Sequence, residues 1–352
     1  FHRNLVPHDH AILQIDYMND MSQLYNDSNL SSPIEVTFQV TERCNLACTY
    51  CYQIAKTPAV MSLDVAKAGV DMVLSDVDYI DSKNRIAVNL DFIGGEPLLE
   101  IDLIKDIYEY FLKKAYELNH PWAYRHRVSF CSNGILFMNE NVQSFLRKYK
   151  QTVSVAITID GPEILHDMCR KFPDGRPSHA IVEKSMKCAI EEYDVRSTKM
   201  TISPENVQYV GSMIKYAYEE LHLSSIFINC TFEGPWSIES SRILYNGFIS
   251  IADYCYEHDT YSNLAISFFV EDDFIMNDYS EDDKNWCGGN GSMLAIAPDG
   301  KCYPCIRYMP SSVGNDVTPL VIGDVYNGLV NRPCEKCVVA TLKSMTATSQ
   351  ST

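Results

Sequence analysis

The alternation of short β-branched runs with longer amphipathic segments is the feature that most constrains how this chain can fold. From residue 34 to residue 258, six runs with strand character are each followed by a segment with the 3.6-residue period of a helix. Six βα units predict an α/β fold with a parallel sheet, open or curled into a partial (β/α)6 barrel with the helices outside. Both forms place an active site at the carboxyl ends of the strands. The expected strands are residues 34–40, 86–93, 128–131, 153–159, 199–202 and 225–230, and the expected helices are residues 63–74, 103–118, 141–149, 180–193, 207–221 and 240–258.

The chain divides into four expected segments. Residues 1–33 form an N-terminal segment that we interpret as incomplete, because the chain begins at Phe1. The barrel is expected over residues 34–258 and an acidic linker over residues 259–285. In residues 286–352, Gly, Pro and Cys cluster and helical periodicity is weak, as in a small domain held together by metal ligands. We expect this last segment to be truncated.

The charge balance and the cysteine usage exclude several classes of protein. Asp plus Glu number 46 against 29 Lys plus Arg, and a net charge of −17 disfavours nucleic-acid binding. No apolar run approaches the roughly 18 residues needed to span a bilayer, so no membrane partner is expected. With 13 cysteines and no signal peptide, a reducing, cytoplasmic location is expected, with thiols acting as ligands rather than in disulfides.

Three cysteines follow the first expected strand on one short loop. Cys44, Cys48 and Cys51 form a C-x3-C-x2-C motif. Three thiolates can hold three corners of a [4Fe–4S] cluster and leave one iron open, the arrangement that separates a catalytic metal site from a closed structural one. Loop-bound zinc more often uses paired C-x2-C units. The motif therefore predicts a [4Fe–4S] cluster with an open iron.

Polar residues and glycines follow the later strands where a ligand of this cluster would lie. Glycines allow the backbone to approach a ligand, a carboxylate can bind an ammonium group, and a guanidinium fork suits a carboxylate. Taken singly, the same residues are equally typical of turns or of a solvated surface charge. The candidates in chain order are Gly94, Gly95, Glu96, Asn133, Asp160, Arg170, Ser203 and Asn206.

With Tyr50 included, the cysteine motif resembles the C-x3-C-x-aromatic-C signature of the radical SAM enzymes. The resemblance implies that the open iron binds S-adenosylmethionine and that an electron from the cluster generates a 5′-deoxyadenosyl radical. It also implies roles for the strand ends. The Gly94-Gly95-Glu96 run would bind the amino group, Asn133 the ribose or the methionine end, and Arg170, after an Asp160-Gly-Pro run, the carboxylate. Ser203 and Asn206 are possible ribose contacts. Tyr50 would lie against the adenine or would pack the loop onto the barrel.

The tail resembles the SPASM extension, which binds one or two auxiliary [4Fe–4S] clusters. Cys287, Gly300 and Cys305 fit its C-x12-G-x4-C start, with a hairpin expected at Asp299-Gly300. The resemblance implies an auxiliary cluster held by four of five candidate thiols, with zinc as the alternative. A full SPASM pattern continues with further cysteines, the first of them at the position that is Lys343 here, and no further thiol follows Cys337, so truncation is expected. The candidates are Cys287, Cys302, Cys305, Cys334 and Cys337, and the favoured set omits Cys302. The remaining cysteines, expected to be small buried residues, are Cys131, Cys169, Cys188, Cys230 and Cys255.

Three functions are compatible with these motifs. The tail looks closest to maturases of peptides with repeated Cys-x3 units, which implies thioether formation in a Cys-rich precursor peptide and an electron donor such as flavodoxin or ferredoxin. The first alternative is sulfatase-maturase-like oxidation of a peptidyl Cys or Ser to formylglycine. That chemistry uses an Asp directly after the G-x4-C cysteine, where this chain has Ile306, although Asp299 or Asp324 could substitute. The second alternative is a non-catalytic iron–sulfur electron carrier.

Overall fold

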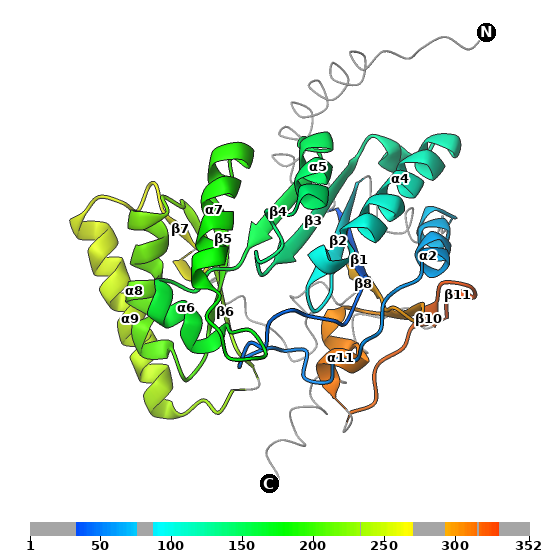
Figure 1. Ribbon diagram of the computed structural model, residues 1–352. Coiled ribbons are helices and arrows are strands. Elements are labelled where there is room, and N and C mark those ends of the chain that lie inside the picture. Colours follow the sequence, from blue (N-terminus) through cyan, green and yellow to red (C-terminus); the bar gives the residue numbers. More distant parts are fainter. Residues whose placement is uncertain (1–32, 76–86, 233, 270–292, 315–316, 331–352) are drawn as a thin grey trace, which may run out of the picture.

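The computed structural model of the protein describes residues 33–75, 87–232, 234–269, 293–314 and 317–330 (Figure 1). The expected N-terminal segment and most of the expected linker lie outside these ranges. Within them, strands and helices alternate along the chain, and the α/β class predicted from the sequence is confirmed.

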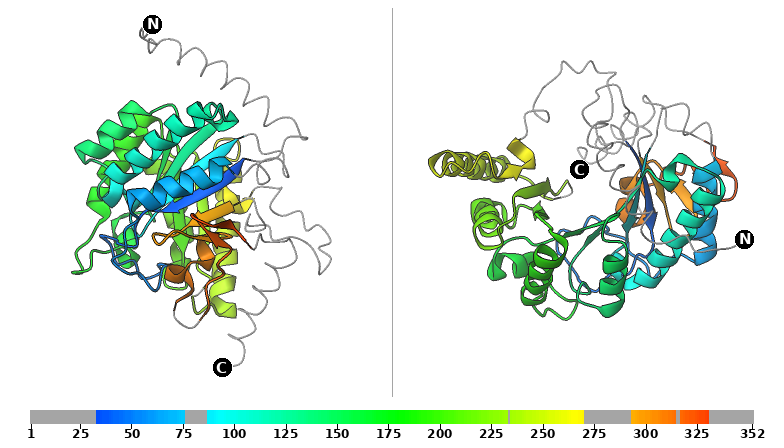
Figure 2. Two further views of the ribbon diagram at one scale, coloured as in Figure 1. Left: turned by 90° about the vertical axis from the view of Figure 1, so that its right-hand side faces the viewer. Right: turned by 90° about the horizontal axis from the view of Figure 1, so that it is seen from above.

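Six parallel strands, in two hydrogen-bonded groups, form the curved layer that was predicted. β1 pairs with β2, β2 with β3 and β3 with β4, while β5 pairs with β6. A bridge between Thr158 and Lys199 joins the end of β4 to β5 and continues the curve. Seen from above, the sheet is an open arc with helices on its outer side (Figure 2). The six strands are β1 (Ile34–Gln39), β2 (Val88–Ile93), β3 (His126–Ser132), β4 (Val153–Ile157), β5 (Ser197–Ile202) and β6 (Ser225–Cys230).

The helices follow the expected positions with two differences. α6 (Glu163–Cys169) was not expected, because seven residues are too few to show a helical period. The helix expected over residues 207–221 is instead a 3₁₀ turn, the short α8 (Val210–Lys215) and a π turn at Tyr216–Glu220. No helix in the described ranges is both long and apolar enough to cross a bilayer. The other helices are α2 (Leu63–Ser75), α4 (Ile101–Glu117), α5 (Glu140–Lys148), α7 (His179–Tyr193) and α9 (Ile238–Glu257).

The two faces of the sheet differ in polarity, and this difference places the core outside the barrel. Phe38, Leu90 and Phe130 alternate with polar neighbours and are buried among the outer helices, each contributing roughly 1.5–3 kcal/mol. The intervening positions point into the barrel, so that Asp91 on β2 and Lys199 on β5 line a cavity instead. The fold therefore has a dry outer core and a polar interior.

The chain after α9 extends this sheet at both of its edges. β7 (Ala265–Ile266) pairs with β6, and β8 (Met293–Ile296) pairs in parallel with β1. Neither contact was expected from the division at residues 258 and 286, because strands of two to four residues carry no readable period. The hairpin expected at Asp299-Gly300 is confirmed, with β9 (Lys301–Tyr303) antiparallel to β8. The rest of the described tail consists of α11 (Pro310–Val313), β10 (Gly323–Asp324) and β11 (Gly328–Leu329).

Candidate active site

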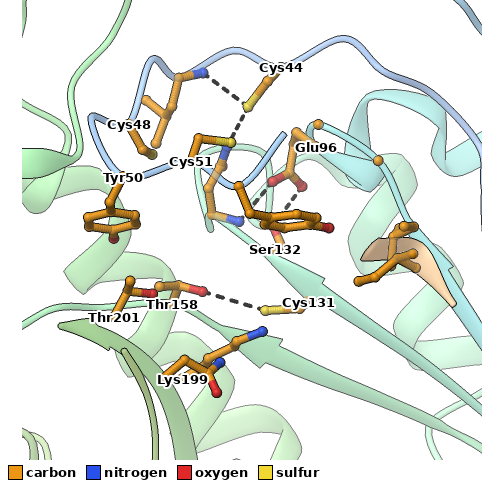
Figure 3. A pocket seen from close by; sticks show the side chains of 18 of the residues that line it. Cys44, Cys48, Tyr50, Cys51, Glu96, Cys131, Ser132, Thr158, Lys199 and Thr201 are labelled. Carbon is orange, nitrogen blue, oxygen red and sulfur yellow. Dashed lines mark hydrogen bonds between the residues drawn. The ribbon is translucent and has the colours of Figure 1, made fainter. Parts of the chain in front are cut away.

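A cavity of about 500 Å³ lies where the six strands end. It receives residues from the loop after β1, from the ends of β2, β3, β5 and β6, and from the tail. Figure 3 shows the thiols on one side of this pocket and Lys199 with Cys131 and Thr158 on the other. The sequence-predicted residues that line it are Cys44, Cys48, Tyr50, Cys51, Gly94, Gly95, Glu96, Asn133 and Arg170.

The loop that carries the three thiols is fixed by backbone hydrogen bonds at both of its ends. The amide of Glu96 donates to the carbonyl oxygen of Arg43 at 2.9 Å, which ties the loop to the end of β2. The amide of Thr49 donates to the carbonyl oxygen of Cys169 at 3.0 Å, which ties it to the end of α6. The loop is therefore positioned by two separate parts of the barrel.

The three thiols lie near one another in a partly dry environment. Burial, with smaller contributions from the neighbouring Cys44 and Cys51 thiols, raises the pKa of Cys48 to about 11, and the positive charge of Arg170 opposes this increase. Within the described ranges, no three His, Cys, Asp or Glu side chains are placed to hold a single metal ion. In a [4Fe–4S] cluster each thiolate binds a different iron, so these ligands need not converge on one point as they do around zinc. The loop therefore fits a cluster better than a single zinc ion.

Gly95 allows the end of β2 to contact the thiol loop directly. A Cβ atom at this position would lie 2.4 Å from the carbonyl oxygen of Arg43 and 2.8 Å from Cβ of Cys44. The first of these neighbours is backbone and cannot rotate away. Glycine is therefore required here for close packing of two backbone segments.

Glu96 lines the pocket and also joins the ends of β2 and β3. Its side chain is 1% exposed. Its carboxylate accepts hydrogen bonds from the hydroxyl of Ser132 and the amide of Asn133, both at 2.8 Å, and from the amide of Leu98 at 3.1 Å. Burial raises the pKa of Glu96, and these donors oppose the increase. The carboxylate is thus fixed in place at the edge of the pocket.

Asn133 supports the thiol loop from the end of β3. Its Nδ2 atom donates to Oδ1 of Asn45 at 2.7 Å and lies 3.8 Å from Sγ of Cys44. Its Oδ1 atom accepts from the amide of Ile135 at 3.0 Å. The Asn-Gly turn and the ligand contact that the sequence left as alternatives are therefore compatible, because the side chain both shapes the turn and lines the pocket.

Arg170, Tyr50 and Asp160 form a buried chain of polar groups beside the thiols. Nη1 of Arg170 donates to the Tyr50 hydroxyl at 2.9 Å, and that hydroxyl donates to the carboxylate of Asp160. Asp160 also accepts from the amide of Thr201 at 3.1 Å. Nε of Arg170 is buried and has no hydrogen-bond partner in the described part of the chain. A guanidinium with an unsatisfied donor suits an anionic ligand such as the carboxylate of S-adenosylmethionine.

Three predicted cofactor contacts do not line the pocket in this structure. Asp160 is fully buried behind Tyr50. The side-chain amide of Asn206 is hydrogen-bonded to the backbone. Its Oδ1 atom accepts from the backbone amide of Ser203 at 2.8 Å, and its Nδ2 atom donates to the carbonyl oxygen of Thr201 at 3.0 Å. The hydroxyl of Ser203 is buried and finds no partner among the described residues. These residues shape the wall behind the pocket.

The two described tail cysteines occupy different packed clusters. Cys302 is fully buried in the main core, and burial raises the pKa of its thiol to about 12. Cys305 packs with Tyr303 and Tyr308 in a separate small cluster. Cys305, which belongs to the favoured ligand set, is also buried, and the choice between the two thiols as ligands stays a prediction. The other candidates, Cys287, Cys334 and Cys337, lie outside the described residues.

The polar residues that line the interior of the barrel were not predicted from the sequence. Glu35, Asp91 and Lys199 line the pocket on β1, β2 and β5, and the signal that could have found them is the alternation of polar and apolar residues along each strand. The expectation that Cys131 and Cys230 are buried core residues was wrong. Both are only partly buried and line the pocket, because they occupy inward-facing positions near the strand ends.

Comparisons with known proteins identify a matching family and several relatives. Residues 38–217 match the model described as the Radical SAM superfamily. An uncharacterised protein of Methanocaldococcus jannaschii is 30% identical over 179 residues, which cover 51% of this chain and 56% of that protein. The cysteine-type anaerobic sulfatase-maturating enzyme of Clostridium perfringens is 26% identical over 288 residues, which cover 76% of this chain and 72% of the enzyme.

A further relative and a solved structure extend the comparison. The antilisterial bacteriocin subtilosin biosynthesis protein of Bacillus subtilis is 23% identical over 308 residues, which cover 86% of this chain and 60% of that protein. The chain thus spans 56% to 72% of the length of these three relatives. The structure of native anSMEcpe with bound AdoMet and a peptide has a TM-score of 0.65 at 21% identity, covering 88% of this chain and 82% of that one. This likeness shows a shared fold.

Proposed function

The chain belongs to the radical SAM superfamily, and we propose that it is a peptide maturase that links a Cys sulfur of a ribosomally made precursor peptide to a carbon atom as a thioether. The superfamily uses a [4Fe–4S] cluster and S-adenosylmethionine. When bound, these groups supply a 5′-deoxyadenosyl radical that removes a hydrogen atom from the substrate. Auxiliary [4Fe–4S] clusters, an electron donor of the flavodoxin or ferredoxin class, and a cytoplasmic location are further parts of the proposal.

The residues around the pocket fit these cofactors. Cys44, Cys48 and Cys51 would each bind one iron of the cluster, and the protein offers no fourth cysteine on the same loop. Arg170 would bind the carboxylate of S-adenosylmethionine through its unsatisfied Nε, and Glu96 would bind the amino group. The chain's part in the first step is thus to orient the ligand between two groups of opposite charge.

The observation that carries the proposal is the position of the residues that follow Cys305. Ile306 and Arg307 line the same cavity as the three thiols. The guanidinium of Arg307 lies 5.3 Å from the ring centroid of Tyr52 and 5.8 Å from that of Phe232. A segment of the cysteine-rich tail therefore forms part of the wall of the candidate active site, which supports a role for an auxiliary cluster in the reaction.

The same wall favours thioether formation over formylglycine formation. At the position where formylglycine chemistry uses an Asp, the pocket wall is the apolar side chain of Ile306. Asp299 is about half exposed and binds Lys301 at 2.9 Å, and Asp324 accepts hydrogen bonds from Asn327. Neither carboxylate lines the pocket, so neither of the substitutes considered from the sequence reaches the cavity.

The names of two relatives support a peptide or protein substrate. One relative matures sulfatases and another takes part in the biosynthesis of the bacteriocin subtilosin. The alternative of a non-catalytic electron carrier is disfavoured, because a carrier needs neither an unsatisfied buried guanidinium nor a cavity of about 500 Å³ beside its cluster.

The test is anaerobic reconstitution of the chain, reduction with dithionite, and addition of S-adenosylmethionine with a synthetic peptide of repeated Cys-x3 units. We expect 5′-deoxyadenosine together with a peptide that has lost two hydrogens and one alkylatable thiol. Cys48→Ala is the matched control and should give neither product.

Other outcomes separate the alternatives. A peptide aldehyde captured by a hydrazide would show formylglycine chemistry in place of thioether formation. A cluster that is reduced by dithionite but never consumes S-adenosylmethionine would support the electron carrier.

A further inference from the structure

The pocket has a charged end that the cofactor contacts do not use. Asp91 on β2 and Glu35 on β1 are inward-facing, half-buried carboxyl groups, and Lys199 reaches toward both from β5. In Figure 3, Lys199 lies across the cavity from the thiols. No ion pair within 4.0 Å joins Lys199 to either carboxyl group in the described structure. The three charges therefore face the cavity without neutralising one another in direct contact.

The carboxyl group of Asp91 is held in a fixed orientation. Ser129 on β3 donates a hydrogen bond from its hydroxyl to one carboxyl oxygen at 2.9 Å, and Thr37 on β1 donates to the other at 3.5 Å. Ser129 is itself fixed by the side-chain amide of Asn89, at 2.9 Å. Hydroxyl donors of this kind orient a carboxylate and leave lone pairs free toward the cavity, because each oxygen can accept more than one hydrogen bond.

The groups facing Asp91 keep it able to exchange a proton near neutral pH. Burial, and after it the negative charge of Glu35, raises the pKa of Asp91 to about 7, against the opposing effects of Ser129 and Lys199. Tyr52, on the thiol loop, faces both Asp91 and Cys51. The thiol of Cys131 on β3 faces the same cavity. A carboxyl group in such surroundings is suited to general acid–base catalysis.

We propose that Asp91 is the general base of the reaction, accepting the proton that the substrate thiol loses when its sulfur bonds to carbon. This inference rests on the proposed function and names a residue that carries out one step of it. Asp91 lines the same cavity as the cluster ligands and the cofactor contacts Glu96 and Arg170, so a substrate bound there can reach all of them.

With the cluster and S-adenosylmethionine bound, the substrate carbon would lose a hydrogen atom to the 5′-deoxyadenosyl radical, which would become 5′-deoxyadenosine. The S–H bond of the peptide Cys breaks, its proton goes to the carboxylate of Asp91, and the C–S bond forms. The one remaining electron passes to a one-electron acceptor of the iron–sulfur class. Glu35 is a positioning residue in this scheme, because it acts only by raising the proton affinity of Asp91.

The principal test compares Asp91→Asn with Asp106→Asn, which removes the same charge from an exposed position on α4. The reconstituted variants are given S-adenosylmethionine and the Cys-x3 peptide, and cross-linked peptide is measured per 5′-deoxyadenosine formed. We expect Asp91→Asn to lower this ratio at least about tenfold while 5′-deoxyadenosine formation stays within about twofold of the wild type. Asp106→Asn should leave both unchanged.

The pH dependence provides a second readout. Cross-linking by the wild type should rise as the pH increases through about 7, because Asp91 accepts a proton only when ionised. Glu35→Gln should retain cross-linking and move this rise to lower pH. Infrared titration of the chain without cofactors gives a measurement independent of activity. A carboxylic-acid band that is lost near pH 7 should be present in the wild type and missing in Asp91→Asn.

Two outcomes would overturn the assignment. One is an unchanged ratio of cross-linked peptide to 5′-deoxyadenosine in Asp91→Asn, and the other is the same infrared titration in wild type and variant. Failure of the proposed function would look different, because the wild type itself would then form no 5′-deoxyadenosine or no cross-link.

Discussion

Arg170 donates a hydrogen bond from Nη1 to the hydroxyl of Tyr50 at 2.9 Å, and so joins the residue that follows α6 to the loop of three thiols. The Tyr50 hydroxyl in turn donates a hydrogen bond to the buried carboxylate of Asp160. The aromatic residue of the cysteine motif therefore acts as a polar link between Arg170 at the pocket and Asp160 behind it. The sequence had left it as either a ring against adenine or a packing residue.

This link predicts the effect of changing Arg170. Arg170→Lys should weaken binding of S-adenosylmethionine about tenfold, because a compact ammonium lacks the planar fork in which Nη1 donates to the Tyr50 hydroxyl while Nε stays available to a carboxylate. Arg176→Lys, at an exposed position, is the matched control and should bind normally. Equilibrium dialysis with the reconstituted protein measures both. Equal affinity in the two variants would exclude Arg170 as a ligand contact.

The close packing at Gly95 predicts that a larger residue there impairs assembly of the cluster site. In Gly95→Ala the new methyl group would meet the Arg43 backbone at 2.4 Å, so the thiol loop must move and we expect iron incorporation to fall severalfold. Gly211→Ala is the control, since its nearest neighbour is the Ile251 side chain at 3.7 Å. Iron and sulfide per chain after reconstitution give the readout. Full iron content in Gly95→Ala would show that the loop tolerates displacement.

The two cysteine sites should have separable roles. Cys48→Ala should abolish formation of 5′-deoxyadenosine, whereas Cys305→Ala should retain part of it and lose most of the modified peptide. Cys188→Ala, on α7 and away from the pocket, should resemble the wild type. Chromatography of the nucleoside and mass spectrometry of the peptide measure the two activities. If Cys48→Ala and Cys305→Ala lost both equally, the proposed division between the sites would be wrong.

The raised pKa of Asp91 predicts that Asp91→Asn increases the free energy of unfolding, by an amount that depends on pH. Its pKa is raised in the folded chain from an ordinary 3.8 to about 7, so the protonated form is favoured by folding. This contribution is complete below about pH 4 and is lost as the pH rises through 7. Asp91→Asn should therefore be more stable than the wild type at pH 8 by on the order of a few kcal/mol, with a smaller difference at pH 5.

Thermal unfolding of the chain without cofactors measures this difference. Asp106→Asn should show no pH-dependent change relative to the wild type. A constant difference between Asp91→Asn and the wild type across this range would indicate that Asp91 ionises normally.

The sequence predicted the parts of the molecule that are encoded locally. The run at residues 34–40 matches β1, and the thiol loop with Gly95 and Glu96 could be recognised because each motif is contiguous. The pairing of β8 with β1 could not be recognised, because a four-residue strand has no readable period and its partner lies far away along the chain.

The interior of the pocket was harder to predict for a similar reason. Asp91 and Lys199 each occur as one polar residue within a strand, and only the curvature of the sheet brings them into one cavity. Asn206 shows the opposite difficulty. Its side-chain amide suits a ribose contact, but its donor and its acceptor are already hydrogen-bonded to the backbone at the end of β5. A sequence pattern does not show whether such a side chain binds the backbone or a ligand.

The pairing of β8 with β1 has a consequence for how the protein is divided or expressed. β1 is held on one edge by β2 and on the other by β8, although β8 follows the whole barrel in the chain. A fragment that ends before Met293 would leave a six-residue strand with one apolar face and open backbone groups beside the loop of three thiols. Such an edge favours intermolecular pairing, so the isolated barrel should aggregate where the longer chain does not.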